Sequence, residues 1–92
     1  MNIEEKLYRA GFEDVVYFPD YGYECIIGID SCNRAVYSFE KMIRYLMDED
    51  GIDDIDAIDW IEYNTIRSLP YINNQTNGCA PIIVYDAEWL GL

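Results

Sequence analysis

Hydrophobic residues recur with helical spacing in the middle of the chain and predict a first amphipathic helix. They fall at i, i+3, i+4, i+7 and i+8 of a 3.6-residue helix: Phe39, Met42, Ile43, Leu46 and Met47. Ser38 is a preferred N-cap residue, and Gly51 supplies the left-handed position that commonly ends a helix. Glu40 stands four residues before Arg44, the favourable order for a helical ion pair. We therefore expect a helix between Ser38 and Gly51 with one buried face.

A second amphipathic helix is predicted directly after the first. It begins at Asp53 or Asp54, which suit both an N-cap and the positive end of a helix. It ends before Pro70, because proline disfavours helical geometry at the preceding residue. Its inner arc holds Ile55, Ile58, Ile61, Thr65, Ile66 and Leu69, and its outer arc holds Asp53, Asp56, Asp59, Trp60, Tyr63, Asn64 and Arg67. Glu62 also projects into the inner arc, so it must reach an edge, pair with an arginine or be protonated.

The flanking segments predict strands and turns. A short helix that Gly11 ends comes first, and residues 71–80 form an uncharged polar loop near the end. Alternating or β-branched residues predict strands over 14–18, 23–30, 34–37 and 81–85. The order α-β-β-β-α-α-β predicts a single compact α+β domain over residues 1–92. In this two-layer fold, an antiparallel β-meander plus a C-terminal strand packs against the two central helices.

The length and composition fit one compact globular domain. About half of the 92 residues are hydrophobic, so intrinsic disorder is disfavoured. No apolar run approaches the ~20 residues that span a bilayer, and the acidic N-terminal segment lacks the apolar core of a signal peptide. The three cysteines, Cys25, Cys32 and Cys79, form no CxxC pair, which favours reduced thiols and a cytoplasmic location.

The residue inventory disfavours the common enzyme classes. Without histidine, neither a Ser-His-Asp nor a Cys-His nucleophile nor a His-ligated metal site is possible, and no phosphate-binding glycine loop is present. A calcium loop aligned on Gly51 would place Leu46 and Ala57 where Asp and Glu are required. We expect no enzyme activity and no cofactor. A weak carboxylate-based divalent-metal site and a carboxylate-dependent hydrolase are kept as alternatives.

Negative charge is concentrated in the central third of the chain. The net charge is −12, and eight carboxylates lie within fifteen residues, the acidic segment 48–62: Asp48, Glu49, Asp50, Asp53, Asp54, Asp56, Asp59 and Glu62. At a helical rise they span roughly 22 Å, or about one charge per 3 Å, which is close to the ~3.4 Å phosphate spacing along one DNA strand. The helix dipole explains Asp53, Asp54 and Asp56. It does not explain acids at positions 48–50, where each costs roughly 0.3–1 kcal/mol.

Such a segment is either a solvated helix face or a surface that binds a basic partner. Direct binding to nucleic acid or to an anionic membrane is disfavoured by the charge. Trp60 and Tyr63 are either covered by residues 71–80 or the N-terminal helix, or are exposed anchors, and Arg67 is placed to stack on Tyr63. The candidate partner-binding residues are Asp48, Glu49, Asp50, Asp53, Asp56, Asp59, Trp60, Tyr63 and Arg67.

Four stretches are distinctive when taken together: RAVY at 34–37, FEKMIRYLMDEDG at 39–51, WIEYNTIRSLPY at 60–71 and APII at 80–83. In these stretches the chain resembles a family of small proteins encoded in phages, prophages and mobile elements of gut Firmicutes. The resemblance implies a short phage-borne protein in the cytoplasm of a bacterial host cell, but no agreed activity. By analogy alone, proteins of this description include inhibitors of host defence, among them anti-CRISPR proteins that occupy a basic nucleic-acid channel.

These observations favour a non-enzymatic inhibitor or adaptor that binds a basic, nucleic-acid-handling host protein in the manner of a DNA mimic. The main alternative is a structural or assembly protein of a mobile element, in which the same residues serve packing. The oligomeric state is left open.

Overall fold

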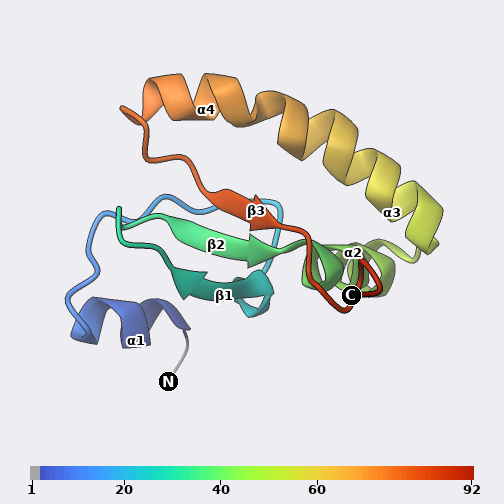
Figure 1. The fold of residues 1–92 in the computed structure, drawn as a ribbon, viewed down its shortest axis with the longest axis horizontal. Coiled ribbons are helices and arrows are strands. Elements are labelled where there is room, and N and C mark those ends of the chain that lie inside the picture. The colour runs from blue at the N-terminus through green and yellow to red at the C-terminus, as the bar shows by residue number, and fades with distance from the viewer. Residues whose placement is uncertain (1–2) are drawn as a thin grey trace.

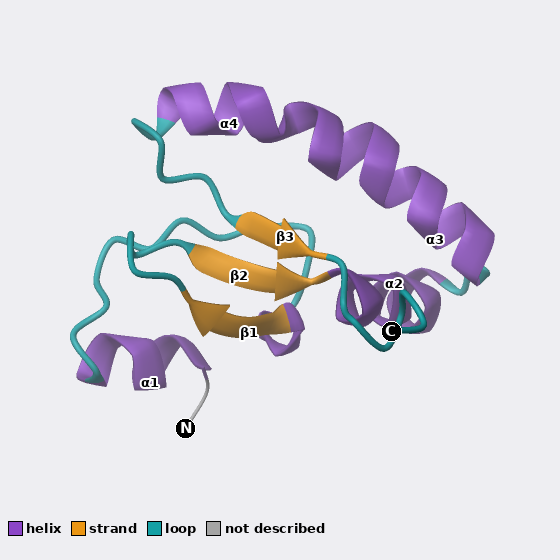
Figure 2. Cartoon of the chain, in the orientation of Figure 1, coloured by secondary structure: helices purple, strands orange, loops and turns teal. Residues whose placement is uncertain are grey.

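A three-stranded mixed sheet forms the centre of the computed structural model, which describes residues 3–92 (Figure 1). Helices and loops alternate with the strands as Figure 2 shows. The helical elements are α1 (Ile3–Arg9), a 3₁₀ turn (Tyr23–Cys25), α2 (Phe39–Asp50), α3 (Asp54–Trp60), a π turn (Ile61–Thr65), a second 3₁₀ turn (Ile66–Ser68) and α4 (Leu69–Gln75). The strands are β1 (Ile26–Ile29), β2 (Ala35–Ser38) and β3 (Ile82–Val84). The predicted α+β class is confirmed.

The sheet departs from the predicted meander. β1 pairs with β2 in antiparallel fashion, whereas β3 lies parallel to β2 on its other side, with Val36 opposite Ile82. A parallel neighbour needs a crossover connection, and helices α2 to α4 supply it (Figure 1). The sheet thus has three strands in the order β1-β2-β3 within the described residues.

The strand predicted over residues 14–18 is wrong, because this segment is irregular. Asp14 has a left-handed φ of 60°, which breaks an extended strand. The N–H of Phe18 donates to the buried hydroxyl of Tyr37 at 3.0 Å, so this backbone group is satisfied by a side chain and not by a strand. Phe18 also packs against the Tyr37 ring with centroids 4.7 Å apart.

One face of the sheet carries the core. Ala35 and Tyr37 contribute to it from β2 and Ile26 from β1, and the other buried side chains come from the helices and from the segment before β1. The core residues are Phe18, Tyr21, Cys25, Ile26, Ala35, Tyr37, Phe39, Met42, Ile43, Leu46, Ala57 and Ile61. Four of the five apolar positions predicted for α2 belong to this cluster, and Met47 is exposed at its edge. The two-layer arrangement therefore has a single hydrophobic core.

Three residues predicted to begin or end a helix do so in the structure. The Ser38 hydroxyl accepts the Lys41 N–H at 3.1 Å, and Gly51 ends α2 with a φ of 66°. The Asp53 carboxylate accepts the Asp56 N–H at 2.8 Å and caps α3. Each contact satisfies a backbone group that a helix end leaves free, or supplies a left-handed turn.

The second helix does not stop at Pro70. From Asp54 the chain continues through the π turn and the second 3₁₀ turn into α4, so the loop predicted over residues 71–80 is helical as far as Gln75. Pro70 sits in the first turn of α4, where a missing N–H is tolerated. Because proline cannot donate to the Ile66 carbonyl, the Leu69 N–H donates to it instead, in the second 3₁₀ turn.

The core-facing side of this long helix is defined by Ala57, Ile61 and Thr65, which follow one another at four-residue spacing and are all buried. Ile55 lies two residues before Ala57, about 200° away around the helix, and is 66% exposed. Glu62 follows Ile55 by seven residues, lies on the same side and is exposed as well. The prediction that Ile55 and Glu62 lie on the inner arc is therefore wrong. The Ile66 N–H donates to the carbonyls of both Ile61 and Glu62 in the π turn. None of the helices within residues 3–92 has the length and apolar character required to cross a membrane.

Candidate functional site

The acidic segment 48–62 is fully accessible to solvent in its charged positions. All eight of its carboxylate side chains are exposed. The ion pairs seen within residues 3–92 join Arg34 to Asp30 and Arg44 to Glu40, each at 2.8 Å, and neither includes a carboxylate of this segment. The acids are therefore not neutralised by the arginines of the same molecule.

The acids do not form one continuous row, which corrects the predicted DNA-like spacing. Residues 48–50 end α2, and the others begin or follow α3 after the turn at Gly51. Because a turn separates the two groups, a uniform helical rise cannot be applied across the whole segment. The structure places four of the eight acids in two separate hollows, two in each.

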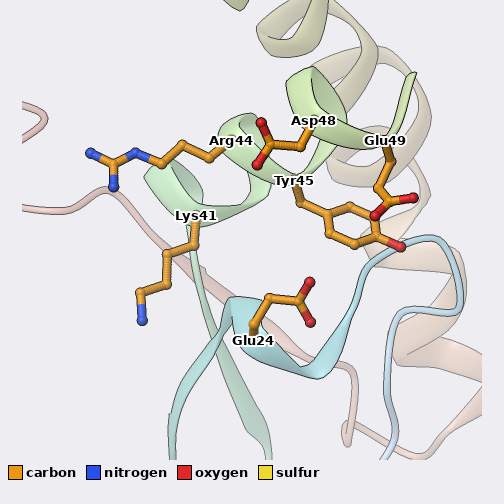
Figure 3. A pocket seen from close by; sticks show the side chains of 6 residues that line it. All are labelled: Glu24, Lys41, Arg44, Tyr45, Asp48 and Glu49. Atoms are coloured by element: carbon orange, nitrogen blue, oxygen red, sulfur yellow. The ribbon is translucent and has the colours of Figure 1, made fainter. Parts of the chain in front are cut away.

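The first surface is a hollow of about 280 Å³ between α2 and the 3₁₀ turn that precedes β1. It is lined by Glu24, Lys41, Arg44, Tyr45, Asp48 and Glu49 (Figure 3). Partial burial, followed by the negative charges of Glu49 and Glu24, raises the pKa of Tyr45. Both cationic and anionic side chains line this hollow, so its electrostatic potential is not uniformly negative.

The second surface is the outer face, which we define as Ile55, Asp59, Glu62, Tyr63 and Arg67. The last four of these residues line one shallow hollow on the long helix. The Arg67 guanidinium carbon lies 4.7 Å from the centre of the Tyr63 ring, the stacking predicted from their i, i+4 spacing. Tyr63 is 68% exposed in spite of this contact, and Ile55 is almost equally exposed about two turns further toward the N-terminus of the helix.

The structure keeps some predicted partner-binding residues together and separates others. Asp59, Tyr63 and Arg67 meet on the outer face, whereas Asp48 and Glu49 line the other hollow. Asp50 and Asp56 are exposed but line neither hollow.

Two predicted residues have structural roles. Asp53 is committed to its helix cap, although its side chain is exposed. Trp60 is half-buried against the core, and its ring meets Tyr21 edge-on with centroids 6.1 Å apart. This aromatic contact comes from the segment before β1, not from residues 71–80 or the N-terminal helix that were expected to cover Trp60. Trp60 is thus mainly a packing residue.

Sequence reasoning missed several residues at these surfaces. Ile55 and Glu62 were assigned to the inner arc, although Ile55, Asp59, Tyr63 and Arg67 follow one another at i, i+4 spacing and could have indicated a shared face. Glu24 reaches the α2 hollow from a distant part of the chain, and no local pattern indicates this.

The chemistry available at these surfaces is that of recognition. Within the described part of the chain, no group of three or more histidine, cysteine, aspartate or glutamate side chains is arranged to hold a metal ion. Asp59 and Glu62 supply two carboxylates beside an exposed aromatic ring and a cation. Comparison with known proteins adds nothing, because no family model, curated protein or solved structure matches the chain.

Proposed function

We propose that this protein is a non-enzymatic inhibitor or adaptor whose outer face binds a basic, nucleic-acid-handling host protein. Binding there would compete with nucleic acid for the cationic surface of the partner. The setting that we propose is the cytoplasm of a bacterial host, with the gene carried by a phage or another mobile element.

The observation that carries the proposal is the combination of exposed apolar anchors and unpaired carboxylates on the outer face. Ile55 and Tyr63 are each about two-thirds exposed, which a helix face serving only solubility does not require. Asp59 and Glu62 lie in the same hollow as Tyr63, and neither forms an ion pair with any residue that the structure describes. Tyrosine and arginine are the residue types that most often dominate the binding energy of an interface.

The contact between Tyr63 and Arg67 supports a role in recognition. The guanidinium above the ring restricts the rotamers of both side chains, so less conformational entropy is lost when a partner packs on the ring. Arg67 also leaves the nearby carboxylates free, because it stacks on Tyr63 and forms no ion pair within the described residues.

The overall charge supports a cationic partner. With a net charge of −12, the protein attracts basic surfaces and repels nucleic acid and anionic lipid. Electrostatic complementarity of this kind accelerates association and makes it sensitive to salt. The outer face then supplies the short-range contacts that select one basic protein among many.

The proposal is tested with two variants of equal net charge. In the first, Asp59→Lys and Glu62→Lys reverse the charges of the outer face, and in the control, Asp20→Lys and Glu88→Lys reverse two exposed charges elsewhere. Each immobilised protein is exposed to host lysate at low salt, and captured proteins are identified by mass spectrometry. A fluorescent duplex DNA then competes for the purified captured protein in an anisotropy titration.

We expect wild type and the control to retain a basic protein that DNA displaces, and the Asp59/Glu62 variant to lose it. Tyr63→Ala, which leaves the carboxylates in place, is expected to weaken binding about 30-fold, the loss of roughly 2 kcal/mol at a central anchor. Equal capture by the two charge variants would show that the outer face is not the binding surface. Simultaneous binding of DNA and this protein to the captured protein would refute the competition.

A further inference from the structure

The turn between β1 and β2 presents a cysteine on a rigid frame. The Asp30 side chain accepts the N–H of Cys32 at 3.0 Å and the N–H of Arg34 at 2.8 Å, and it also pairs with the Arg34 guanidinium. Asn33 completes the turn with a left-handed φ of 64°. Cys32 therefore occupies a fixed position at the tip of this turn, and its side chain is exposed.

A second exposed cysteine, Cys79, lies on the segment that leads into β3. β2 and β3 are parallel, so the residues before each strand lie at the same end of the sheet (Figure 1). Val36 pairs with Ile82 at the start of the parallel ladder, and Asn33, the neighbour of Cys32, and Cys79 each precede that pair by three residues. Gly78, which precedes Cys79, has a left-handed φ of 84°, a conformation that glycine adopts without steric cost.

Arg34 gives an independent indication that the two thiols share one neighbourhood. Its hydrogen bond with Asp30 raises the pKa of its guanidinium, and the sulfur atoms of Cys32 and Cys79 both add to this effect. The third cysteine differs from these two in its burial and its reactivity. Cys25 is fully buried in the core, and burial raises the pKa of its thiol to about 12, which makes it unreactive.

We propose that Cys32 and Cys79 form a site of oxidative modification, at which a low-molecular-weight disulfide such as oxidised glutathione converts the two thiols to an intramolecular disulfide. The Cys32 thiolate attacks one sulfur of the oxidant, the S–S bond of the oxidant breaks, one small thiol leaves, and Cys32 is left in a mixed disulfide with the other half of the oxidant. The Cys79 thiolate then attacks the Cys32 sulfur and releases the second small thiol. The protein loses two electrons and two protons, and the oxidant gains them.

The bond would join the tip of the β1–β2 turn to the entry of β3 and close a loop of about half the chain. Closing a loop of that length restricts the unfolded state, so the oxidised protein should be the more stable form. This inference rests on the end of the sheet and is independent of the proposed function of the outer face.

The experiment uses the full-length protein and oxidised glutathione. After incubation, free thiols are alkylated under denaturing conditions, and intact mass and proteolytic peptides are recorded by mass spectrometry. We expect one alkylated cysteine, Cys25, and a linked pair of peptides containing Cys32 and Cys79, with a mass lower by two hydrogen atoms. Oxidation should raise the melting temperature by roughly 10 °C, and dithiothreitol should reverse the change.

Three variants make the outcome decisive. Cys25→Ser should still form the linked peptides, whereas Cys32→Ser and Cys79→Ser should each accumulate a mixed disulfide with glutathione on the remaining exposed cysteine. Glutathione on both Cys32 and Cys79 of the wild-type protein, without linked peptides, would overturn the proposal. So would a disulfide found between two molecules instead of within one.

Discussion

Asp86 ties the C-terminal segment to the start of α2, and its removal is the prediction that the structure defines most sharply. The buried Ser38 hydroxyl donates to one carboxylate oxygen at 2.6 Å, and the Glu40 N–H donates to the other at 3.0 Å. Ser38 in turn accepts the Lys41 N–H. The N-terminus of α2 is thus capped from within the helix sequence and from a residue that follows β3.

The expected cost of Asp86→Ala is about 2–3 kcal/mol of unfolding free energy. Two hydrogen bonds to an ionised acceptor are lost, each contributing roughly 1.5–3 kcal/mol when well shielded, and the partial exposure of Asp86 reduces the sum. The variant also leaves the Ser38 O–H donor without its partner in the core, and it removes a negative charge from the positive end of α2. Asp86→Asn, which keeps one acceptor oxygen, should lose about half as much.

Urea unfolding followed by circular dichroism measures this change, and Glu88→Ala is the matched control. Glu88 is exposed and carries the same charge, so its replacement should change stability by less than about 0.5 kcal/mol. Burial acts to raise the pKa of Asp86, but the hydrogen bonds from Ser38 and Glu40 outweigh it and hold that pKa below 3.8. The stabilisation is therefore fully present above pH 3.8 and is lost as the pH falls further. Two results would refute the reasoning. One is a loss of unfolding free energy below about 0.5 kcal/mol in Asp86→Ala at pH 7. The other is a difference in stability between wild type and Asp86→Ala that stays the same as the pH is lowered below 3.8.

Three further predictions concern the core and the helix ends. Tyr21→Phe removes the buried hydrogen bond of 2.7 Å to Thr65 and should lower the free energy of unfolding by about 1–2 kcal/mol. Most of this loss should be recovered when Thr65→Val is added, because no unpaired hydroxyl is then left in the core. A double variant as unstable as Tyr21→Phe alone would contradict this prediction. Burial raises the pKa of Tyr37 and Cys25 to about 12, so both groups stay protonated in the folded protein at pH values where they ionise in the unfolded chain. The free energy of unfolding should therefore be constant up to pH 9 and then fall by up to about 1.4 kcal/mol per pH unit for each group. A urea midpoint that does not change between pH 9 and 11 would contradict this prediction. Asp50→Asn removes a negative charge from the negative end of the α2 dipole and should raise the free energy of unfolding by about 0.3–1 kcal/mol at low salt. The gain should be smaller in 1 M salt, because salt screens the interaction. A variant less stable than wild type would contradict this prediction.

The sequence predicts correctly those features that depend on neighbouring residues. Ser38, Gly51 and Asp53 occupy the helix ends assigned to them, because capping involves residues only three or four positions apart. The stacking of Arg67 on Tyr63 follows from the same local geometry. Local rules were sufficient at each of these positions.

Where the sequence misled, a distant contact or a compensating hydrogen bond decided the outcome. The Phe18 N–H is satisfied by a hydroxyl nineteen residues away, so no strand forms there. The Leu69 N–H takes the place of the one that Pro70 lacks, and the helix continues. Trp60 is drawn toward the core by Tyr21, a contact that helical spacing cannot reveal.

The candidate site was only partly predicted. Helical spacing identifies Asp59, Tyr63 and Arg67, and it also places Glu62, three residues after Asp59, beside them. The prediction missed Glu62 and Ile55 because it took the isoleucines as the buried side of the helix, whereas Ala57, Ile61 and Thr65 are the residues that are buried. Glu24 joins Asp48 and Glu49 through tertiary packing alone. Charge density was therefore a correct indicator of exposed acids but not of their arrangement.

The most direct test of the central claim is a nuclear magnetic resonance titration of the isotope-labelled protein with an arginine-rich, nucleic-acid-binding peptide. The outer face combines carboxylates with an exposed ring, so we predict saturable shift changes at Ile55, Asp59, Glu62 and Tyr63 that exceed those at Asp20 and Glu88. These changes should be lost in the Asp59→Lys, Glu62→Lys variant. Small shifts spread evenly over all exposed carboxylates would contradict the claim that the outer face is a binding surface.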